Sequence, residues 1–163
     1  CDAMLKAAAV RLLLSRSICS GKYMVLVCGD VGAVAASVET GARVGRHSLV
    51  DSFVIPNLHE SVAPAIAGVH KVEVLEALGI IESFSVASLI EAADAAVKTA
   101  AVKLIEIRLA MALGGKAFVT MTGSVADVRS AVEAGASVAA AKGLLTNKVV
   151  IPQPRPELLR EMI

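Results

Sequence analysis

The sequence is poor in residue types on which many binding sites depend, and each shortage excludes a class of function. Aromatic residues make up 2% of the 163 residues, with three Phe, one Tyr and no Trp. The stacking platforms that bind single-stranded nucleic acid are therefore missing. The 16 basic and 15 acidic residues are interspersed and leave a net charge of +1, with no basic stripe. We expect no nucleic-acid partner.

Long hydrophobic runs are also missing, although the chain is apolar overall. Hydrophobic residues make up 56% of the sequence, and the mean hydropathy is +0.71. No stretch of about 18 residues is free of charges and helix breakers, so we expect no membrane span. A small domain with this much apolar surface buries part of it against partners, and we expect an oligomer.

Cysteine is scarce, and no catalytic pattern accompanies it. The chain has Cys1, Cys19 and Cys28, without a C-x-x-C spacing or a secretory signal, which favours a reducing compartment over a disulfide framework. Cys28 lies in an apolar strand pattern and predicts core packing, and a packing role is also expected for Cys1. The three histidines share no ligand spacing, and no nucleophile–base set or phosphate loop is present. We expect no enzymatic activity.

The chain contains an internal duplication. Asp2–Leu12 recurs as Asp94–Leu104 with seven of eleven positions identical, and Lys22–Val44 recurs as Lys116–Val138 with ten of 23 identical. The copies are separated by 92 residues in the first block and 94 in the second. This period is too long for a solenoid repeat and indicates two small tandem domains. We place them at residues 1–71 and 72–163.

The second copy predicts an α+β domain of the ferredoxin-like type. Strands are expected over 77–84, 102–109, 117–122 and 144–151, and helices begin after Ser85 and Ser124, which are good N-caps. A short helix is expected over 157–162. The order strand, helix, strand, strand, helix, strand is that of the split βαβ sandwich.

The first copy gives the same order from the part that is present. Strands are expected over 10–18, 22–28 and 49–55, a helix follows Asp30 to about Gly45, and a short helix covers 60–66. The counterpart of the 77–84 strand would fall before Cys1. We therefore expect that roughly 15 to 20 residues, with the first strand of this copy, are missing from the start.

The short sequence motifs that recur in both copies resemble those of the bacterial microcompartment shell domain. The resemblance covers nearly the whole chain twice and implies two tandem shell domains of the class in which three chains form a pseudohexagonal tile. It also implies a place in a microcompartment shell in the cytoplasm, with neighbouring shell tiles as partners. The matching residues are Asp2, Lys6, Val10, Gly21-Lys22, Gly29-Asp30-Val31 and Gly41-Ala42, then Asp94, Lys98, Val102, Gly115-Lys116, Gly123-Ser124-Val125 and Gly135-Ala136.

One short segment resembles a particular subgroup of this family. Ser17–Lys22 (SICSGK) is similar to the iron–sulfur subgroup of propanediol-utilisation shell proteins, except that Ser20 stands where proline is expected. The resemblance implies that Cys19 ligates a [4Fe–4S] cluster, one per homotrimer, at a pore loop formed by Ile18, Ser20, Gly21 and Lys22. Chemically, one thiol per chain suffices only if a threefold axis gathers three, because cubane clusters need several thiolates. Arg16 and Lys22 would favour the thiolate.

The same resemblance assigns Lys6 and Lys98 to the tile edge, where they would meet neighbouring tiles. The alternative is that each is a solvated cation near a helix C-terminus. The family's Pro-Arg-Pro-His word reads Pro56-Asn57-Leu58-His59 and Pro152-Gln153-Pro154-Arg155 here, so the edge arginine is replaced in both copies.

Three functions stay open from the sequence. The first is a structural tile with a cluster at its pore for electron transfer or cluster exchange. The second is a tile whose pore conducts a small metabolite, with Cys19 as a lining residue and no cluster. The third is a ligand-binding regulatory or enzyme subunit, because this fold hosts many unrelated functions.

Overall fold

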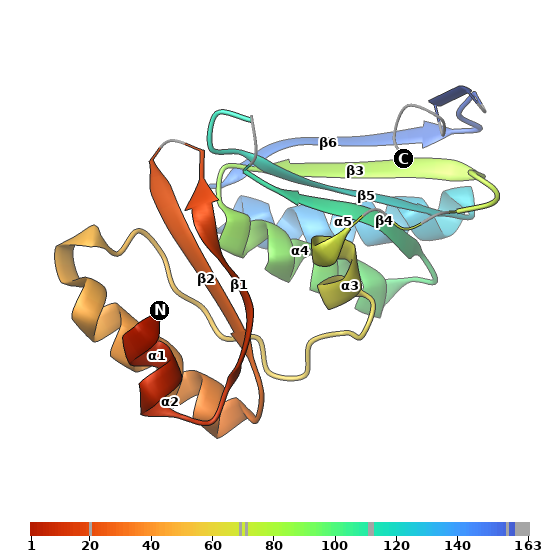
Figure 1. Ribbon diagram of the computed structural model, residues 1–163. Helices are drawn as coiled ribbons and strands as arrows, with labels where there is room; N and C mark the ends of the chain where they lie inside the picture. The colour runs from red at the N-terminus through yellow and green to blue at the C-terminus, as the bar shows by residue number, and fades with distance from the viewer. Residues whose placement is uncertain (20, 69, 71, 111–112, 156, 159–163) are drawn as a thin grey trace. The chain divides into compact units, whose positions relative to one another are not determined.

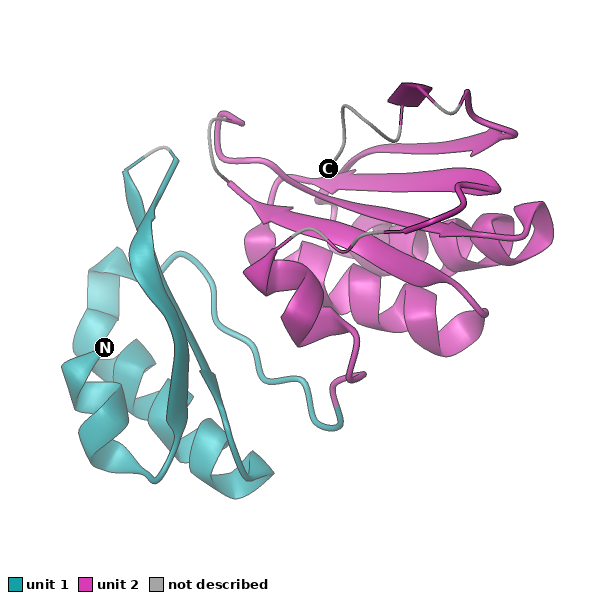
Figure 2. Ribbon diagram, turned by 45° about the vertical axis from the view of Figure 1, so that its right-hand side comes forward, with its two compact units in different colours: residues 1–57 teal, residues 58–163 magenta. Residues whose placement is uncertain are grey.

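The computed structural model describes residues 1–19, 21–68, 70, 72–110, 113–155 and 157–158. By packing, the chain divides into two compact units, Cys1–Asn57 (unit 1) and Leu58–Ile163 (unit 2), which Figure 2 shows in different colours. The division at residue 71 was drawn from the sequence repeat, and it stays a prediction. Each unit is described by itself below.

Unit 2 is built on a four-stranded antiparallel sheet in the order β4-β5-β3-β6. Its strands are β3 (Ala77–Ser83), β4 (Lys103–Leu109), β5 (Ala117–Gly123) and β6 (Leu145–Pro152). Helices α4 (Val86–Thr99) and α5 (Val125–Ala141) cover one face of this sheet (Figure 1). This arrangement confirms the ferredoxin-like fold that the pattern predicted.

The core of unit 2 lies between the sheet and the two helices. Ile81 on the central strand and Leu89 on α4 are fully buried. The helices cross closely at Gly135, where an added Cβ would lie 2.6 Å from the carbonyl oxygen of Ala92. Only glycine fits at that distance, and the small residues along both helices allow the approach.

Both helices of unit 2 begin at the predicted caps. The Ser85 hydroxyl accepts a hydrogen bond from the backbone N–H of Ser88 at 3.3 Å, and the Ser124 hydroxyl accepts one from Asp127 N–H at 3.1 Å. Each cap satisfies a backbone donor that the first turn of a helix leaves without an intrahelical acceptor.

Unit 2 also contains a short helix from the end of the first sequence copy. Helix α3 (Val62–Ala67) packs against β4 and α4, close to the predicted range 60–66. Val62 and Ala65 are completely buried there. Just before the helix, the backbone N–H of His59 donates to Asp94 Oδ1 at 2.8 Å.

Unit 1 consists of two helices and a hairpin. Its elements are α1 (Asp2–Ala7), β1 (Arg11–Ile18), β2 (Lys22–Cys28), α2 (Val31–Gly45) and a 3-10 turn, η1 (Arg46–Ser48). The Asp30 carboxylate caps α2 by accepting from Gly32 and Ala33 N–H, as predicted. Helix α1 packs on α2, where Met4 is buried and Ser37 donates to its carbonyl oxygen at 3.0 Å.

One predicted strand is wrong: residues 49–55 form no strand. In unit 2 the corresponding strand β6 pairs with β3, and the counterpart of β3 in the first copy would fall before Cys1. A strand without a neighbour has no ladder partner for its backbone groups. Of the predicted helix over 157–162, Glu157 and Leu158 are helical, and the other residues lie outside the described ones.

Candidate functional site

The predicted pore loop is the tip of the β1–β2 hairpin. Ile18 and Lys22 are opposite each other in the register, so residues 19–21 make the connection. Gly21 has a φ of +69°, in the left-handed region that a three-residue hairpin needs and that glycine adopts without strain. Ser20 lies outside the described residues.

Cys19 is partly exposed at this tip. A Cβ added at Gly21 would meet no atom within 4 Å, so the backbone beside the thiol is open to an incoming group. Arg16 lies on β1 three residues before Cys19, and its Nε is buried without a hydrogen-bond partner among the described residues. Buried donors are normally satisfied, and no acceptor for this nitrogen lies among the described residues.

The other two cysteines have different surroundings. Cys28 ends β2 and is half-buried, and its sulfur accepts a hydrogen bond from Arg11 Nε at 3.3 Å. This is a peripheral position, and the prediction that Cys28 packs in a core is therefore wrong. Cys1 is exposed, which contradicts the packing role expected for it. All three cysteines are described, and none forms a disulfide.

The corresponding hairpin of unit 2 has no thiol. Strands β4 and β5 are joined by residues 110–116, a longer connection that contains Gly114 and Gly115, both with positive φ. Lys116, the counterpart of Lys22, forms an ion pair with Glu82 at 2.8 Å. Met111, in the same connection, lies outside the described residues. The two hairpins are therefore chemically unequal.

The residues present do not form a cluster site within one chain. Among the described residues, no three His, Cys, Asp or Glu side chains gather closely enough to hold a metal ion. A partly exposed thiol on an open hairpin tip, beside basic residues, is a suitable donor for a cluster shared between copies. It does not suit a cluster held by one polypeptide.

Lys6 and Lys98 occupy equivalent helix positions in different surroundings. Lys6, in the last turn of α1, pairs with Asp2 at 2.7 Å, and the two side chains are 75% and 80% exposed. Lys98, in the last turn of α4, pairs with Asp94 at 2.6 Å, and the exposed fractions are 37% and 10%. Both lysines sit at the ends of helices, as predicted, and their role at a tile edge stays a prediction.

Asp94 links two segments of unit 2 through its carboxylate, and the sequence did not reveal this role. Its two carboxylate oxygens bind different partners, the backbone N–H of His59 and the Lys98 ammonium. The i,i+4 spacing of Asp94 and Lys98 signals the ion pair. No sequence signal reveals the His59 contact, because it joins residues 35 positions apart.

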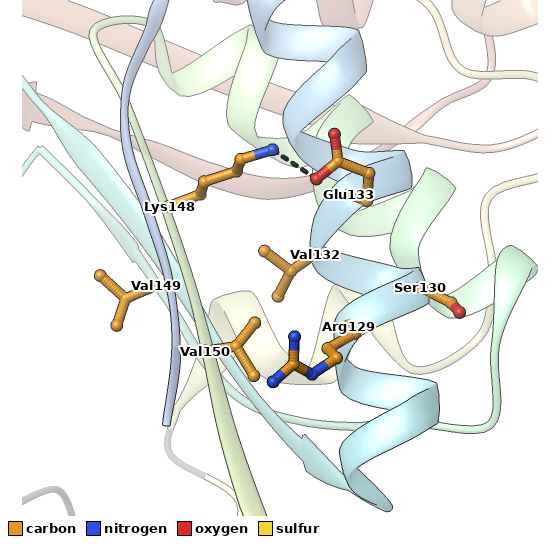
Figure 3. Close-up of a pocket in the computed structure, with 7 residues that line it drawn as sticks. All are labelled: Arg129, Ser130, Val132, Glu133, Lys148, Val149 and Val150. Carbon is orange, nitrogen blue, oxygen red and sulfur yellow. Dashed lines mark hydrogen bonds and ion pairs between the residues drawn. The ribbon is translucent and has the colours of Figure 1, made fainter. Parts of the chain in front are cut away.

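A shallow surface hollow of about 560 Å³ lies between α5 and β6 in unit 2. Glu133 and Lys148 form an ion pair across it, and Arg129 and Val132 line the α5 side (Figure 3). Its one carboxylate is engaged by the lysine, and the lining residues include no histidine or cysteine. The hollow therefore offers no acid–base or nucleophilic pair.

Each of the two units contains the repeated hairpin and its helices, which is the tandem arrangement that the duplication predicted. Among the described residues, no helix has the length and apolarity needed to span a bilayer. The family model described as "BMC domain" matches residues 1–58 and 77–154. The chain belongs to this family, the bacterial microcompartment shell proteins, which confirms the resemblance drawn from the sequence.

Individual relatives and a solved structure support the same family. The chain is 46% identical to the bacterial microcompartment shell protein PduT of Citrobacter freundii over 162 residues, covering 99% of this chain and 88% of the relative. It is 42% identical to the shell protein EutM of Salmonella typhimurium over 84 residues, 52% of this chain and 85% of that protein. A solved microcompartment protein from Desulfitobacterium hafniense superimposes with a TM-score of 0.91 at 53% identity, covering 98% and 88% of the two chains.

Proposed function

We propose that three copies of this chain form a pseudohexagonal tile of a microcompartment shell, with a [4Fe–4S] cluster at the threefold pore. Six domains of one family would surround the axis, two from each chain. The full-length similarity to PduT supports a tile of the tandem class. The chemical inequality of the two hairpins carries the proposal, because a threefold axis places three identical Cys19 loops around the pore.

In this proposal Cys19 is the ligand and Arg16 and Lys22 are its electrostatic support. Three thiolates on one axis leave one iron for a ligand that is not protein, and the bound cluster would supply one-electron redox chemistry. The positive charge of Arg16 and Lys22 lowers the cost of gathering three thiolates. The buried Arg16 Nε–H, which lacks a partner among the described residues, is a candidate donor toward the site. The residues of the second hairpin would fill the pore wall.

The test is anaerobic purification with quantitation of iron and acid-labile sulfide per chain, together with the mass of the oligomer. We expect a trimer with about four irons per three chains and a visible iron–sulfur absorbance. The Cys19→Ser variant should lose the iron and keep the trimer. Cys28→Ser is the matched control, because it changes a thiol on the same hairpin away from the tip, and it should keep the iron.

The outcomes separate the two parts of the proposal. A wild-type trimer without iron or sulfide would remove the cluster and leave a tile whose pore conducts a small metabolite. Iron that survives Cys19→Ser would show that Cys19 is not the ligand. A chain that stays monomeric at all concentrations would contradict the tile itself.

A further inference from the structure

We infer that the described residues 153–155 and 157–158 (the tail) dock on helix α1 of a second copy of this chain, and that the chain carries the template for this contact internally. The inference rests on the proposed tile and adds which residues join its copies. Its basis is the duplication: the first copy's counterpart of the tail is already docked, and the second copy's tail has the same backbone turn.

The internal template lies within unit 2. Near the end of the first copy, His59 N–H binds the Asp94 carboxylate on α4 at 2.8 Å. Helix α3 then packs against α4 and β4 and buries Val62 completely. The first copy's end thus anchors to the second copy by one charge-assisted hydrogen bond and one apolar side chain.

The tail repeats this anchor segment in backbone detail. The two segments are 96 residues apart, the separation of Val54-Ile55-Pro56 and Val150-Ile151-Pro152. Asn57 has a φ of 60° and its counterpart Gln153 a φ of 53°. A 3.0 Å hydrogen bond joins Val62 N–H to the His59 carbonyl, and its counterpart joins Leu158 N–H to the Arg155 carbonyl at the same distance. The tail is preorganised for the same docking.

The acceptor for this tail is the surface of α1 around Asp2. Asp2 is the counterpart of Asp94, but its side chain is 80% exposed where that of Asp94 is 10% exposed. Leu158 is the counterpart of the fully buried Val62, but it is 39% exposed. The hydrogen-bond acceptor and the apolar anchor of the template are thus both present and both uncovered in the single chain.

The Arg155 side chain is engaged within the tail itself. Its guanidinium binds the Glu157 carboxylate at 3.0 and 3.2 Å and holds the pKa of Glu157 below its ordinary value. The backbone N–H of Arg155 is the counterpart of His59 N–H, so it is the group that would donate to Asp2.

The occupant of α1 is a second copy because the template contact runs from the end of one sequence copy to the start of the next copy along the chain. The tail's own unit already has its α4 surface covered by α3. Donor and acceptor surfaces differ, so the contact is head-to-tail, and contacts of this kind form a closed ring when the rotation between successive copies closes. Three chains passing their tails in one direction would complete the tile.

The first experiment measures the dissociation constant of the oligomer by sedimentation equilibrium. Leu158→Glu and Asp2→Ala should each weaken assembly by about 10- to 100-fold, the effect of losing one buried leucine or one hydrogen bond to a charged group. Leu158→Met and Asp2→Asn, which keep an apolar anchor and an acceptor, should stay near wild type. Circular dichroism should be unchanged in all four, because both positions are exposed in the single chain.

The second experiment decides which chain supplies the tail. In a background with serine at residues 1, 19 and 28, Asp2→Cys and Arg155→Cys are placed on separate chains, co-expressed with different tags and oxidised. A disulfide-linked heterodimer on a non-reducing gel supports docking between copies. If only a chain carrying both substitutions closes, as a monomer with an internal disulfide, the tail docks on its own chain and the inference is wrong.

The result that would contradict the tail contact differs from the result that would contradict the proposed tile. If Leu158→Glu and Asp2→Ala leave a wild-type trimer, the tail contact is wrong and the tile stands. If the wild-type chain is monomeric, the tile is wrong as well.

Discussion

Units 1 and 2 share short sequence motifs, but these motifs lie in different structural surroundings. Asp2–Lys6 and Asp94–Lys98 form the same i,i+4 ion pair at almost the same distance, 2.7 and 2.6 Å. Only the second pair is covered, because α3 and His59 lie over it. An aspartate and a lysine four positions apart therefore form the same ion pair in both helices, while the energetic weight of the pair depends on what packs above it.

The helix crossing gives the sharpest form of this comparison. Gly41 and Gly135 are counterparts. A Cβ at Gly135 would lie 2.6 Å from a backbone oxygen of Ala92, whereas at Gly41 it would lie 2.7 Å from atoms of the Met4 side chain. A side chain can rotate away, and a helix backbone in a packed core cannot.

We therefore predict the largest difference for alanine at these two positions. Gly135→Ala should lower the free energy of unfolding of unit 2 by about 2 to 3 kcal/mol, because the α4–α5 crossing must open. Gly41→Ala should stay within about 1 kcal/mol of wild type, since better helix propensity offsets the displaced methionine. Hydrogen exchange of peptides from each unit, followed through urea unfolding, measures both. Equal losses at the two glycines would contradict the comparison.

The next largest effect is expected at the buried acid. Asp94→Ala should destabilise unit 2 by about 2 kcal/mol, because it leaves the half-covered Lys98 ammonium and the His59 N–H without their acceptor. Asp94→Asn keeps an oxygen for His59 and should lose less. Asp2→Ala should change the stability of the isolated chain by less than about 0.5 kcal/mol, as expected for an exposed pair.

The measurement is denaturation of dilute protein, with exchange protection of α3 as the local readout. Protection of α3 should fall in Asp94→Ala and stay unchanged in Asp2→Ala. A loss of α3 protection in Asp2→Ala would show that the two acids are not separated in this way.

The smallest effect is expected at the helix caps, where the two units should lose the same amount of stability. Asp30→Ala and Ser124→Ala each remove a side-chain cap that accepts backbone N–H groups at the start of a long helix. Each should cost about 1 kcal/mol, because capping is local and independent of what covers the helix. Asn at either position should restore most of the loss. Melting of the two variants checks this, and a difference well above 1 kcal/mol between them would show that tertiary context reaches the caps.

Sequence patterns located most elements of the fold correctly. The caps Ser85, Ser124 and Asp30 were predicted because they combine a short polar side chain with a following apolar helical period. The strand over 49–55 was predicted wrongly because its apolar residues fit a strand, and only pairing decides whether a strand forms. Among the described residues of unit 1, only β1 and β2 pair as strands, so residues 49–55 have no strand neighbour there.

Part of the candidate site was also predictable from the sequence, and part was not. A β-hairpin around Cys19 follows from two apolar runs and the Gly21-Lys22 turn, and the structure places the cysteine at its tip. The resemblance to shell domains was also readable, because short words recur in order and spacing, and the family match confirms it. The cluster stays a proposal, because its ligands would come from three chains and one chain contains only one of them.

The sequence by itself determined the duplication, the helix caps, the i,i+4 ion pairs and the family, because each follows from the order and spacing of residues along the chain. Only the tertiary structure decided that Asp94 is covered while Asp2 is exposed, and that Gly135 faces a backbone while Gly41 faces a side chain. These differences arise from packing between segments far apart in sequence, and packing density depends on every neighbour at once.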